Sequence, residues 1–393
     1  MNKKIIRITT VPLALRYLLE GQMRFINENG FDVIMISAEG TGLEEVIAGE
    51  KCRHIIVPMT RKISPVQDLK CLFQLIQIFK KEKPDIVHTH TPKAGLLGML
   101  AAKICGVKIR IHTIAGLKFV TATGKTRKIL IAMEKLTTSA ANYIWPNSYS
   151  LLQTVKNYKL AAPGKMKVIA SGSSNGINLK RFAKQALTTE TLFGVKKLLN
   201  YDPGLKYLLF VGRIVKDKGV EELLEVFASL YENDTALRLI LVGSFEEALD
   251  PLNEQAKKIL SSHPGLVQIP WSNEVEYFIS LSLMLIHPSH REGFPNVLLQ
   301  AGAMKCPVIC SAIDGNIDII DHKKTGLLFK KGDREDLKEK ILFALENRES
   351  MLNAAETLYN KIHTSFNTNV VQQKILEEYQ LLILESKSRN EPL

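Results

Sequence analysis

A short stretch in the second half of the chain, REGFPNVLLQ, joins a carboxylate to the start of a helix. Glu292 precedes a Gly-Phe-Pro turn, and Pro295 stands where an apolar helical pattern begins, a position that tolerates its missing N–H. Backbone N–H groups around residues 294–297 favour negative charge, whereas a carboxylate suits hydroxyl groups. Gln300 lies one turn beyond Asn296 on the same helical face. The stretch predicts a site for a ligand with phosphate and hydroxyl groups; the alternative is a capping Glu and an exposed Gln.

A second stretch, FVGRIVKDKGVEELLEVF, places two cations after a strand-like run. Arg213 and Lys218 follow the apolar residues 208–211 and precede a helical pattern that begins near Val220. Two cations at the carboxyl end of a strand, beside a helix N-terminus, predict a site for a dianion such as a diphosphate. The alternative is a solvated loop with ordinary surface charges.

Three histidines lie near the ends of strand-like runs in the first half of the chain. His112 follows the apolar run VKIRI, where an imidazole can bond a sugar hydroxyl near a reacting centre or a backbone group. His88 and His90 share one face of a strand, a spacing that also occurs in metal sites. No cluster of Cys or carboxylates accompanies them, and the chain has no Asp-X-Asp triplet. We therefore expect no metal ion, with Arg213 and Lys218 in its place.

The elements that position these residues repeat along the chain. Short apolar runs alternate with amphipathic stretches, the pattern of parallel sheets covered by helices on both faces. One series occupies the first half, and a second begins at LKYLLFVGR. We predict an α/β protein with two doubly wound, Rossmann-like domains that face a cleft, because ligands bind at the carboxyl ends of parallel strands. The predicted parts are residues 1–185, residues 186–365 and a C-terminal helix in residues 366–393 that packs back toward the N-terminal domain.

Composition narrows the class of protein. A chain of 393 residues with 46% hydrophobic content suits two cores, and a net charge of +12 favours an anionic partner. Five scattered cysteines argue against a disulfide framework and for a reducing, cytoplasmic setting. No apolar run is long enough to span a membrane, and Arg7 and Arg16 interrupt the start of the chain, unlike a signal peptide. No GxGxxG follows the first strand and no P-loop motif occurs, which argues against a nicotinamide enzyme and a P-loop nucleotidase.

Several motifs in a fixed order resemble the retaining glycosyltransferases of family 4, which share the GT-B fold. They are GQMRFINENGFDVIMIS, DIVHTHTPKAGLLGMLAAKICGVKIRIHT, NGINLKRF, FVGRIVKDKGVEELLEVF, HPSHREGFPNVLLQAGAMKCPVI and GNIDIIDHKKTGLLF. Together they cover nearly the whole chain. The resemblance implies transfer of a sugar from a nucleotide sugar with retention of anomeric configuration and without a metal or other cofactor. The N-terminal domain is then expected to bind the acceptor and the C-terminal domain the donor.

The resemblance also implies roles for individual residues. Arg213 and Lys218 match the cations that bind the donor diphosphate. Glu292 matches the first glutamate of the Glu-X7-Glu pattern, which approaches the transferred sugar, and His112 matches the histidine beside that sugar. Gly21 is the match for the glycine loop after the first strand. Contacts with the sugar and phosphates are expected along the backbone of Gly293, Phe294, Pro295 and Asn296.

One position departs from the family pattern. Gln300 stands where the second glutamate accepts hydroxyl protons from the ribose of the donor. An amide oxygen still accepts a hydrogen bond, but it lacks the charge-assisted part, of order 1 kcal/mol. We expect weaker nucleotide binding or a changed ribose geometry.

The chain looks most like the bacterial branch that builds surface polysaccharides. This resemblance implies a UDP-sugar donor, an α-linked product, a lipid-linked or oligosaccharide acceptor, and a cytoplasmic protein that is peripheral on the inner face of the membrane. The stretch 116–136 combines basic and apolar residues, a mixture that suits contact with an anionic membrane surface. The alternative is a solvated amphipathic helix. The apolar residues of the stretch include Phe119, Ile129, Leu130 and Ile131.

Two other functions remain open from the sequence. One is a nucleotide-sugar epimerase or hydrolase of the same fold. The other is a non-catalytic protein whose basic surface binds nucleic acid, for which the chain shows no basic motif interleaved with aromatic residues. We therefore expect no nucleic-acid partner.

Overall fold

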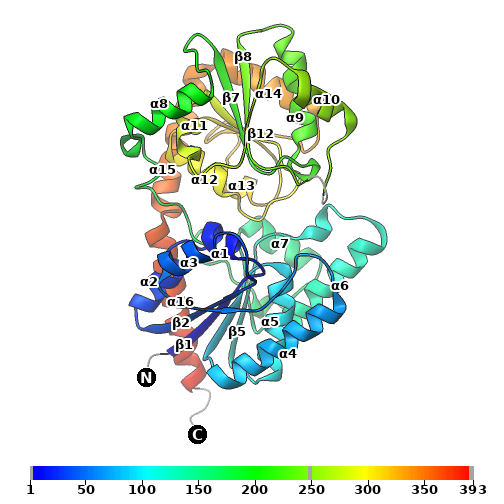
Figure 1. Ribbon diagram of the computed structural model, residues 1–393, viewed down its shortest axis with the longest axis vertical. Helices are drawn as coiled ribbons and strands as arrows, with labels where there is room; N and C mark the ends of the chain where they lie inside the picture. The colour runs from blue at the N-terminus through cyan, green and yellow to red at the C-terminus, as the bar shows by residue number, and fades with distance from the viewer. Residues whose placement is uncertain (1–2, 247–249, 389–393) are drawn as a thin grey trace. The chain divides into compact units, whose positions relative to one another are not determined.

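The computed structural model describes residues 3–246 and 250–388 and divides into two compact units (Figure 1). One unit comprises the residues up to Gly176 and those from Thr368 on; the other is Ile177–Asn367. The division falls after Gly176 rather than after residue 185, because Ile177 and Phe182 are buried in the core of the second unit. The C-terminal helix belongs to the first unit.

The first unit contains a parallel sheet of six strands in the order β3-β2-β1-β4-β5-β6. Its strands are β1 (Lys3–Ile8), β2 (Phe31–Ser37), β3 (Arg53–Ile56), β4 (Ile86–Thr89), β5 (Ile109–Ile114) and β6 (Tyr143–Pro146). The central strands are buried on both faces, as their nearly continuous apolar sequences require. The strand order reverses between β1 and β4, which is the topological switch point of this sheet.

Helices cover both faces of the first sheet. The helices are α1 (Pro12–Leu18), α2 (Gln22–Glu28), α3 (Leu43–Glu50), α4 (Pro65–Glu82), α5 (Pro92–Ile104), α6 (Gly124–Ala140), α7 (Tyr149–Asn157) and α16 (Thr368–Ser388), with short 3-10 turns at Lys118–Val120 and Pro163–Lys165. Helices α4, α5 and α6 lie side by side on one face (Figure 1). Helices α2 and α16 pack on the other face, around Ile5, Val33 and Tyr379. Two layers of helices thus enclose the sheet.

The second unit contains another parallel sheet of six strands, in the order β12-β11-β10-β7-β8-β9. Its strands are β7 (Lys206–Val211), β8 (Leu237–Val242), β9 (Leu266–Ile269), β10 (Met284–His287), β11 (Val308–Ser311) and β12 (Leu327–Phe329). Counted from its own first strand, this is the strand order of the first sheet. Its topological switch point lies between β7 and β10, where Met284 pairs with Leu208.

The second sheet is also covered on both faces. Its helices are α8 (Thr189–Leu198), α9 (Val220–Tyr231), α10 (Glu254–Ser262), α11 (Val275–Leu281), α12 (Asn296–Ala303), α13 (Asn316–Ile319), α14 (Arg334–Glu346) and α15 (Arg348–Ser365), with 3-10 turns at Lys184–Ala186 and Lys216–Lys218. Helices α8, α11 and α12 bury one core, and α9, α10 and α14 bury the other.

The predicted fold class is confirmed, since both sheets are parallel and lie between helices. All five cysteines are free. Among the described residues, no helix combines the length and apolar character needed to cross a membrane.

Candidate active site

The loops after β7 and β10 approach each other at the switch point of the second sheet. Gly219, with φ of 67°, permits this approach, because a Cβ there would lie 2.1 Å from the carbonyl oxygen of Pro288. The N–H of His290 donates to the carbonyl oxygen of Asp217 at 2.9 Å and ties the two loops together. Edges of this kind are where open parallel sheets bind ligands.

Lys218 and Glu292 lie together at this edge. The ammonium group of Lys218 donates to Oε1 of Glu292, and Nε2 of His287 lies 3.0 Å from the same oxygen. Burial acts to raise the pKa of Glu292, but Lys218 and His287 outweigh it and hold that pKa well below its usual range. Glu292 is therefore an anion that accepts two charge-assisted hydrogen bonds.

His287 is a site residue that the sequence analysis missed. It ends β10, is buried, and donates to Glu292 because an ionised carboxylate can only accept. Within the described residues its Nδ1 is buried without a hydrogen-bond partner. The signal was a polar residue at the end of the apolar run LMLIH, five positions before the glutamate.

Arg213 follows β7, but it is also paired with a carboxylate. Its Nη1 lies 2.6 Å from Oε2 of Glu246, in the loop after β8. A third pair joins Arg291 to Asp217 at 2.6 Å. The cations predicted to bind a diphosphate are thus present at the switch point, and each is partly neutralised by an acidic neighbour.

The start of α12 differs slightly from the prediction. Pro295 is the N-cap residue rather than the first helical residue, and its carbonyl oxygen accepts the N–H of Leu298 at 3.2 Å. The ring of Phe294 packs in the core, and its centroid lies 5.2 Å from that of the Phe366 ring. Only the backbone of Phe294 is therefore available to a ligand. A Cβ on Gly315 would lie 2.4 Å from the carbonyl oxygen of Gly293, which shows how tightly this turn is packed.

Gln300 lies in the second turn of α12, which begins at Asn296, and is half-buried. Its side chain makes no hydrogen bond to any residue that the structure describes. The side-chain amide of Gln300 therefore does not stabilise the fold through a hydrogen bond to the described residues.

His112 lies in the first unit, at the carboxyl end of β5. It is buried, its Nδ1 lies 2.9 Å from Oγ1 of Thr89, and a Cβ on Gly95 would lie 2.3 Å from its Cε1. Burial lowers its pKa to about 4, so the imidazole is neutral at pH 7. Close packing against α5 fixes the ring.

Gly21 does not lie in the loop after the first strand, and this part of the prediction is wrong. It lies between α1 and α2, with φ of 73°. Its N–H donates to Glu50 at 2.5 Å. That donor is used within the fold and is not available to a phosphate.

His88 and His90 belong to a buried network around Arg7. The guanidinium donates to the hydroxyl of Tyr379 at 2.7 Å and lies 2.9 Å from Nε2 of His90. Nδ1 of His88 lies 2.6 Å from the same hydroxyl. Within residues 3–246 and 250–388, no group of three His, Cys, Asp or Glu could hold a metal ion. The two histidines here have a structural role.

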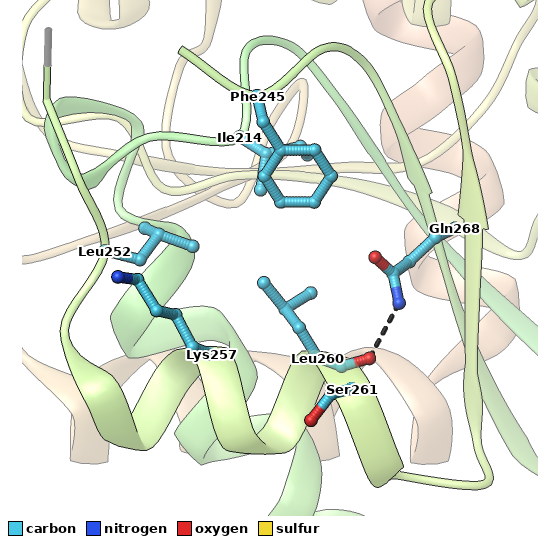
Figure 2. A pocket seen from close by; sticks show the side chains of 7 residues that line it. All are labelled: Ile214, Phe245, Leu252, Lys257, Leu260, Ser261 and Gln268. Carbon is cyan, nitrogen blue, oxygen red and sulfur yellow. Dashed lines mark hydrogen bonds between the residues drawn. The ribbon is translucent and has the colours of Figure 1, made fainter. Parts of the chain in front are cut away.

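A pocket of about 220 Å³ lies between α10 and the loops after β7 and β8 (Figure 2). Its lining is mainly apolar: Ile214, Phe245, Leu252, Lys257, Leu260, Ser261 and Gln268. The amide of Gln268 donates to the carbonyl oxygen of Leu260 at 2.7 Å, as Figure 2 shows. None of the predicted site residues lines it, although Ile214 directly follows Arg213.

Two family models match the chain, "Glycosyl transferase 4-like" over residues 11–148 and "Glycosyl transferases group 1" over residues 196–361. With the two parallel sheets, these matches define a glycosyltransferase of the GT-B class. The capsular polysaccharide biosynthesis glycosyltransferase CapM of Staphylococcus aureus is 32% identical over 388 residues, which cover 99% of this chain and 100% of that protein. The chain belongs to this family of group 1 glycosyltransferases and is a transferase.

Two further proteins show how far the similarity extends. The Escherichia coli UDP-Gal:alpha-D-GlcNAc-diphosphoundecaprenol alpha-1,3-galactosyltransferase is 27% identical over 387 residues, with 96% of each chain covered. The crystal structure of Anabaena HepE in complex with UDP and glucose has a TM-score of 0.78 at 13% identity, covering 96% of this chain and 99% of that one. The predicted family is confirmed.

Proposed function

We propose that the protein transfers a sugar from a UDP-sugar to a lipid-linked or growing surface-polysaccharide acceptor, with retention of configuration to give an α-linkage and without a metal ion. The observation that carries the proposal is the chain of contacts from His287 through Glu292 to Lys218 at the switch point of the second sheet. It combines an acceptor for sugar hydroxyls with a cation for phosphate. The names of the relatives support the UDP donor and the lipid-linked acceptor.

The cations act on the leaving group. Arg213 and Lys218 offset the charge that builds on the diphosphate as the glycosidic bond breaks, and the first turn of α12 adds backbone N–H donors. Because both cations already have carboxylate partners, a diphosphate competes with Glu246 and Glu292 for them. Donor binding therefore redistributes hydrogen bonds among charges that are already in place.

The other groups position the sugar. Glu292, oriented by His287, accepts hydroxyl protons of the transferred sugar. For neutral His112, in the first unit, the family resemblance implies a hydrogen bond to a sugar hydroxyl. The leaving phosphate takes the acceptor proton on the same face of the sugar. No side chain is assigned as the general base.

The test is a transfer assay with a panel of UDP-, GDP-, ADP- and dTDP-sugars and a synthetic N-acetylglucosaminyl-diphosphoundecaprenol acceptor. We expect one UDP-sugar to give a glycolipid product by mass spectrometry, an α-anomeric proton by NMR, and the same yield with EDTA. Release of free sugar or of an epimer without glycolipid would support the epimerase or hydrolase instead. A thermal-shift screen with the same nucleotides tests the donor site, and no shift with any of them would contradict it.

Arg213→Ala tests the phosphate role directly. We expect it to abolish transfer while the fold is retained, because the diphosphate loses a charge-assisted partner. Arg334→Ala is the matched control, since Arg334 is a partly exposed arginine of the same unit that also pairs with a glutamate, Glu225. Normal turnover by Arg213→Ala would contradict the assignment.

A further inference from the structure

Almost all of the excess positive charge of the chain lies in residues 57–142. This stretch holds fifteen Lys and Arg but four Asp and Glu, a formal charge of +11 out of +12 for the whole chain. It contains α4, α5 and α6, which form one helical layer on the first sheet (Figure 1). The net charge is therefore a property of one side of the first unit.

The four acidic side chains of this stretch do not balance the exposed cations. Each is either paired with a lysine or buried: Asp68 with Lys93 at 2.6 Å, Glu82 with Lys4 at 3.0 Å, Asp85 with Lys3 at 2.9 Å, and Glu134 in the interior. The outer surface of this helical layer is consequently basic.

The outward side of α4 is also apolar at its N-terminal end. Cys71, Leu75 and Phe79 point into the core. Four other apolar side chains, on α4 and the loop before it, are exposed: Ile63 by 64%, Val66 by 72%, Leu69 by 53% and Phe73 by 59%. Spacings of three and four residues place Val66, Leu69 and Phe73 in one stripe along the helix. We call these four residues the α4 stripe.

Cations surround the α4 stripe. Lys70, Lys80 and Lys81 lie on the same helical face, and Arg61 and Lys62 precede the helix; all five are exposed. The apolar residues and Lys70 occupy the first half of this face, and the other four cations occupy its second half and the loop. This arrangement matches the boundary between acyl chains and anionic headgroups in a bilayer.

Helix α6, which packs against α5 as α4 does, contributes both cations and exposed apolar side chains. Phe119 is fully buried, so the predicted membrane contact through this residue is wrong. Leu130 and Ile131 are half-buried against the core. The outer face of α6 exposes Lys125, Lys128 and Lys135, together with Ile129 by 52% and Leu136 by 47%.

We infer that the α4 stripe inserts into the headgroup region of an anionic lipid bilayer, while the cations of α4 and α6 bind lipid phosphates. Protein partners fit this surface less well, because lysine is depleted from protein interfaces. Single-stranded nucleic acid requires several aromatic rings for stacking, and the α4 stripe has one, Phe73. The inference rests on the proposed function in that a lipid-linked acceptor requires the enzyme to work at a membrane surface.

The test is co-sedimentation of the full chain, without donor or acceptor, with phosphatidylcholine vesicles that contain or lack phosphatidylglycerol. We expect binding to need phosphatidylglycerol and to fall with added salt. Leu69→Asp with Phe73→Asp should weaken binding about tenfold or more, since two apolar side chains are removed and two anions added. The matched control is Leu381→Asp with Leu384→Asp, at exposed positions of α16 on the other face of the sheet, and it should change binding by less than about twofold.

Three results with vesicles would overturn the inference: equal binding by the stripe variant and the wild type, equal loss of binding in both double variants, or binding that does not depend on phosphatidylglycerol. Tighter binding of polyuridylate than of vesicles at the same salt would indicate nucleic acid instead. A dimer that the stripe variant dissociates would indicate a second copy of the chain. A retained thermal shift with UDP shows that the stripe variant is folded. If the wild-type protein binds vesicles but no nucleotide sugar stabilises it, the proposed function is contradicted, and the inference about the α4 stripe is not.

Discussion

The two switch points can be compared directly, because the two sheets have the same strand order. In the second unit, Lys218 and Glu292 form an ion pair whose side chains keep 16% and 13% of their surface exposed. In the first unit, Arg7 is fully buried, and its hydrogen-bond partners are neutral: Tyr379, Gln22 and His90. One switch point keeps charges within reach of a ligand, and the other encloses its charge in the core.

The difference shows that topology sets the location of a site but not its use. Carboxyl ends of parallel strands concentrate polar groups in both units. In the first unit these groups bind the C-terminal helix through Tyr379, whereas in the second they remain near solvent. The chemistry therefore depends on what else the chain packs against each edge.

The largest expected effect comes from breaking the charged switch point. Lys218→Met and Glu292→Gln should each lower kcat/KM for transfer by about 100-fold or more, because a partner of the developing charge is lost. Lys218→Met also leaves Glu292 buried without its main counter-charge. The double variant should lose much less than the product of the two effects, as measured by steady-state kinetics. Multiplicative losses would show that the two side chains act independently.

The second prediction compares a glycine near each switch point. Both substitutions should lower the free energy of unfolding in urea by about 1 kcal/mol, because both glycines have a positive φ. Gly219→Ala should lower it by at least about 2 kcal/mol more than Gly21→Ala, because the new Cβ at residue 219 meets the backbone of another loop. At Gly21 the nearest atom to such a Cβ is 3.8 Å away, against 2.1 Å at Gly219. Equal costs would mean that the loops of the second unit separate readily.

The third prediction concerns acid. Burial holds the pKa of His112 at about 4 and those of His88 and His90 well below the usual value. Two buried carboxyls of this unit oppose the effect, because burial raises the pKa of Glu134 to about 7 and also raises that of Glu50. Since the three histidines outnumber them, the unfolded first unit binds more protons than the folded one, and its stability falls as pH drops from about 6.5 toward 4. The slope from His112 alone approaches about 1.4 kcal/mol per pH unit. In the second unit, Glu292 loses its contribution only at lower pH, below the pKa of an unfolded carboxyl.

The two tryptophans allow this to be measured for each unit. Trp145 is buried in the first unit and Trp271 is exposed in the second. In the Trp271→Phe variant, the emission of Trp145 reports on the first unit, and its urea midpoint should decrease when the pH is lowered from 6.5 to 4.5. In the Trp145→Phe variant, the emission of Trp271 reports on the second unit, and its midpoint should decrease less. Equal falls would contradict the contrast between the two units.

The smallest effect is expected at Gln300. Gln300→Glu should tighten UDP binding about fivefold, since a charge-assisted hydrogen bond to the ribose is worth roughly 1 kcal/mol more than a neutral one. Isothermal titration with UDP measures this, and UDP-independent stability serves as the control. An unchanged affinity would show that residue 300 does not reach the ribose.

The repeated elements could be predicted from sequence because their patterns are local. The run LKYLLFVGR at residues 205–213, expected to begin the second series, contains the strand Lys206–Val211. The positions of Arg213, Lys218 and Glu292 followed from the rule for parallel strands. These statements needed only periodicity and strand direction.

The remaining features depend on contacts between distant residues. The sequence does not show that Phe119 packs into the core while Phe73 on α4 stays exposed, because both lie in amphipathic helical stretches. The bond from His287 to Glu292 depends on the bend of the loop, and the contact between Arg7 and Tyr379 joins opposite ends of the chain. Such pairings cannot be found by reading a window of neighbours.

The return of α16 to the first sheet has a consequence for how the chain is made. The second unit is continuous in sequence, whereas the first needs Val371, Ile375 and Tyr379 to complete its core. During synthesis, Arg7 leaves the ribosome before any part of the second unit, and Tyr379 leaves it only after the whole of that unit. Domains usually fold in the order of their synthesis; here the second unit can finish while the first still waits for its last helix. A first unit that lacks its C-terminal helix is thus a normal intermediate in the co-translational folding of this enzyme.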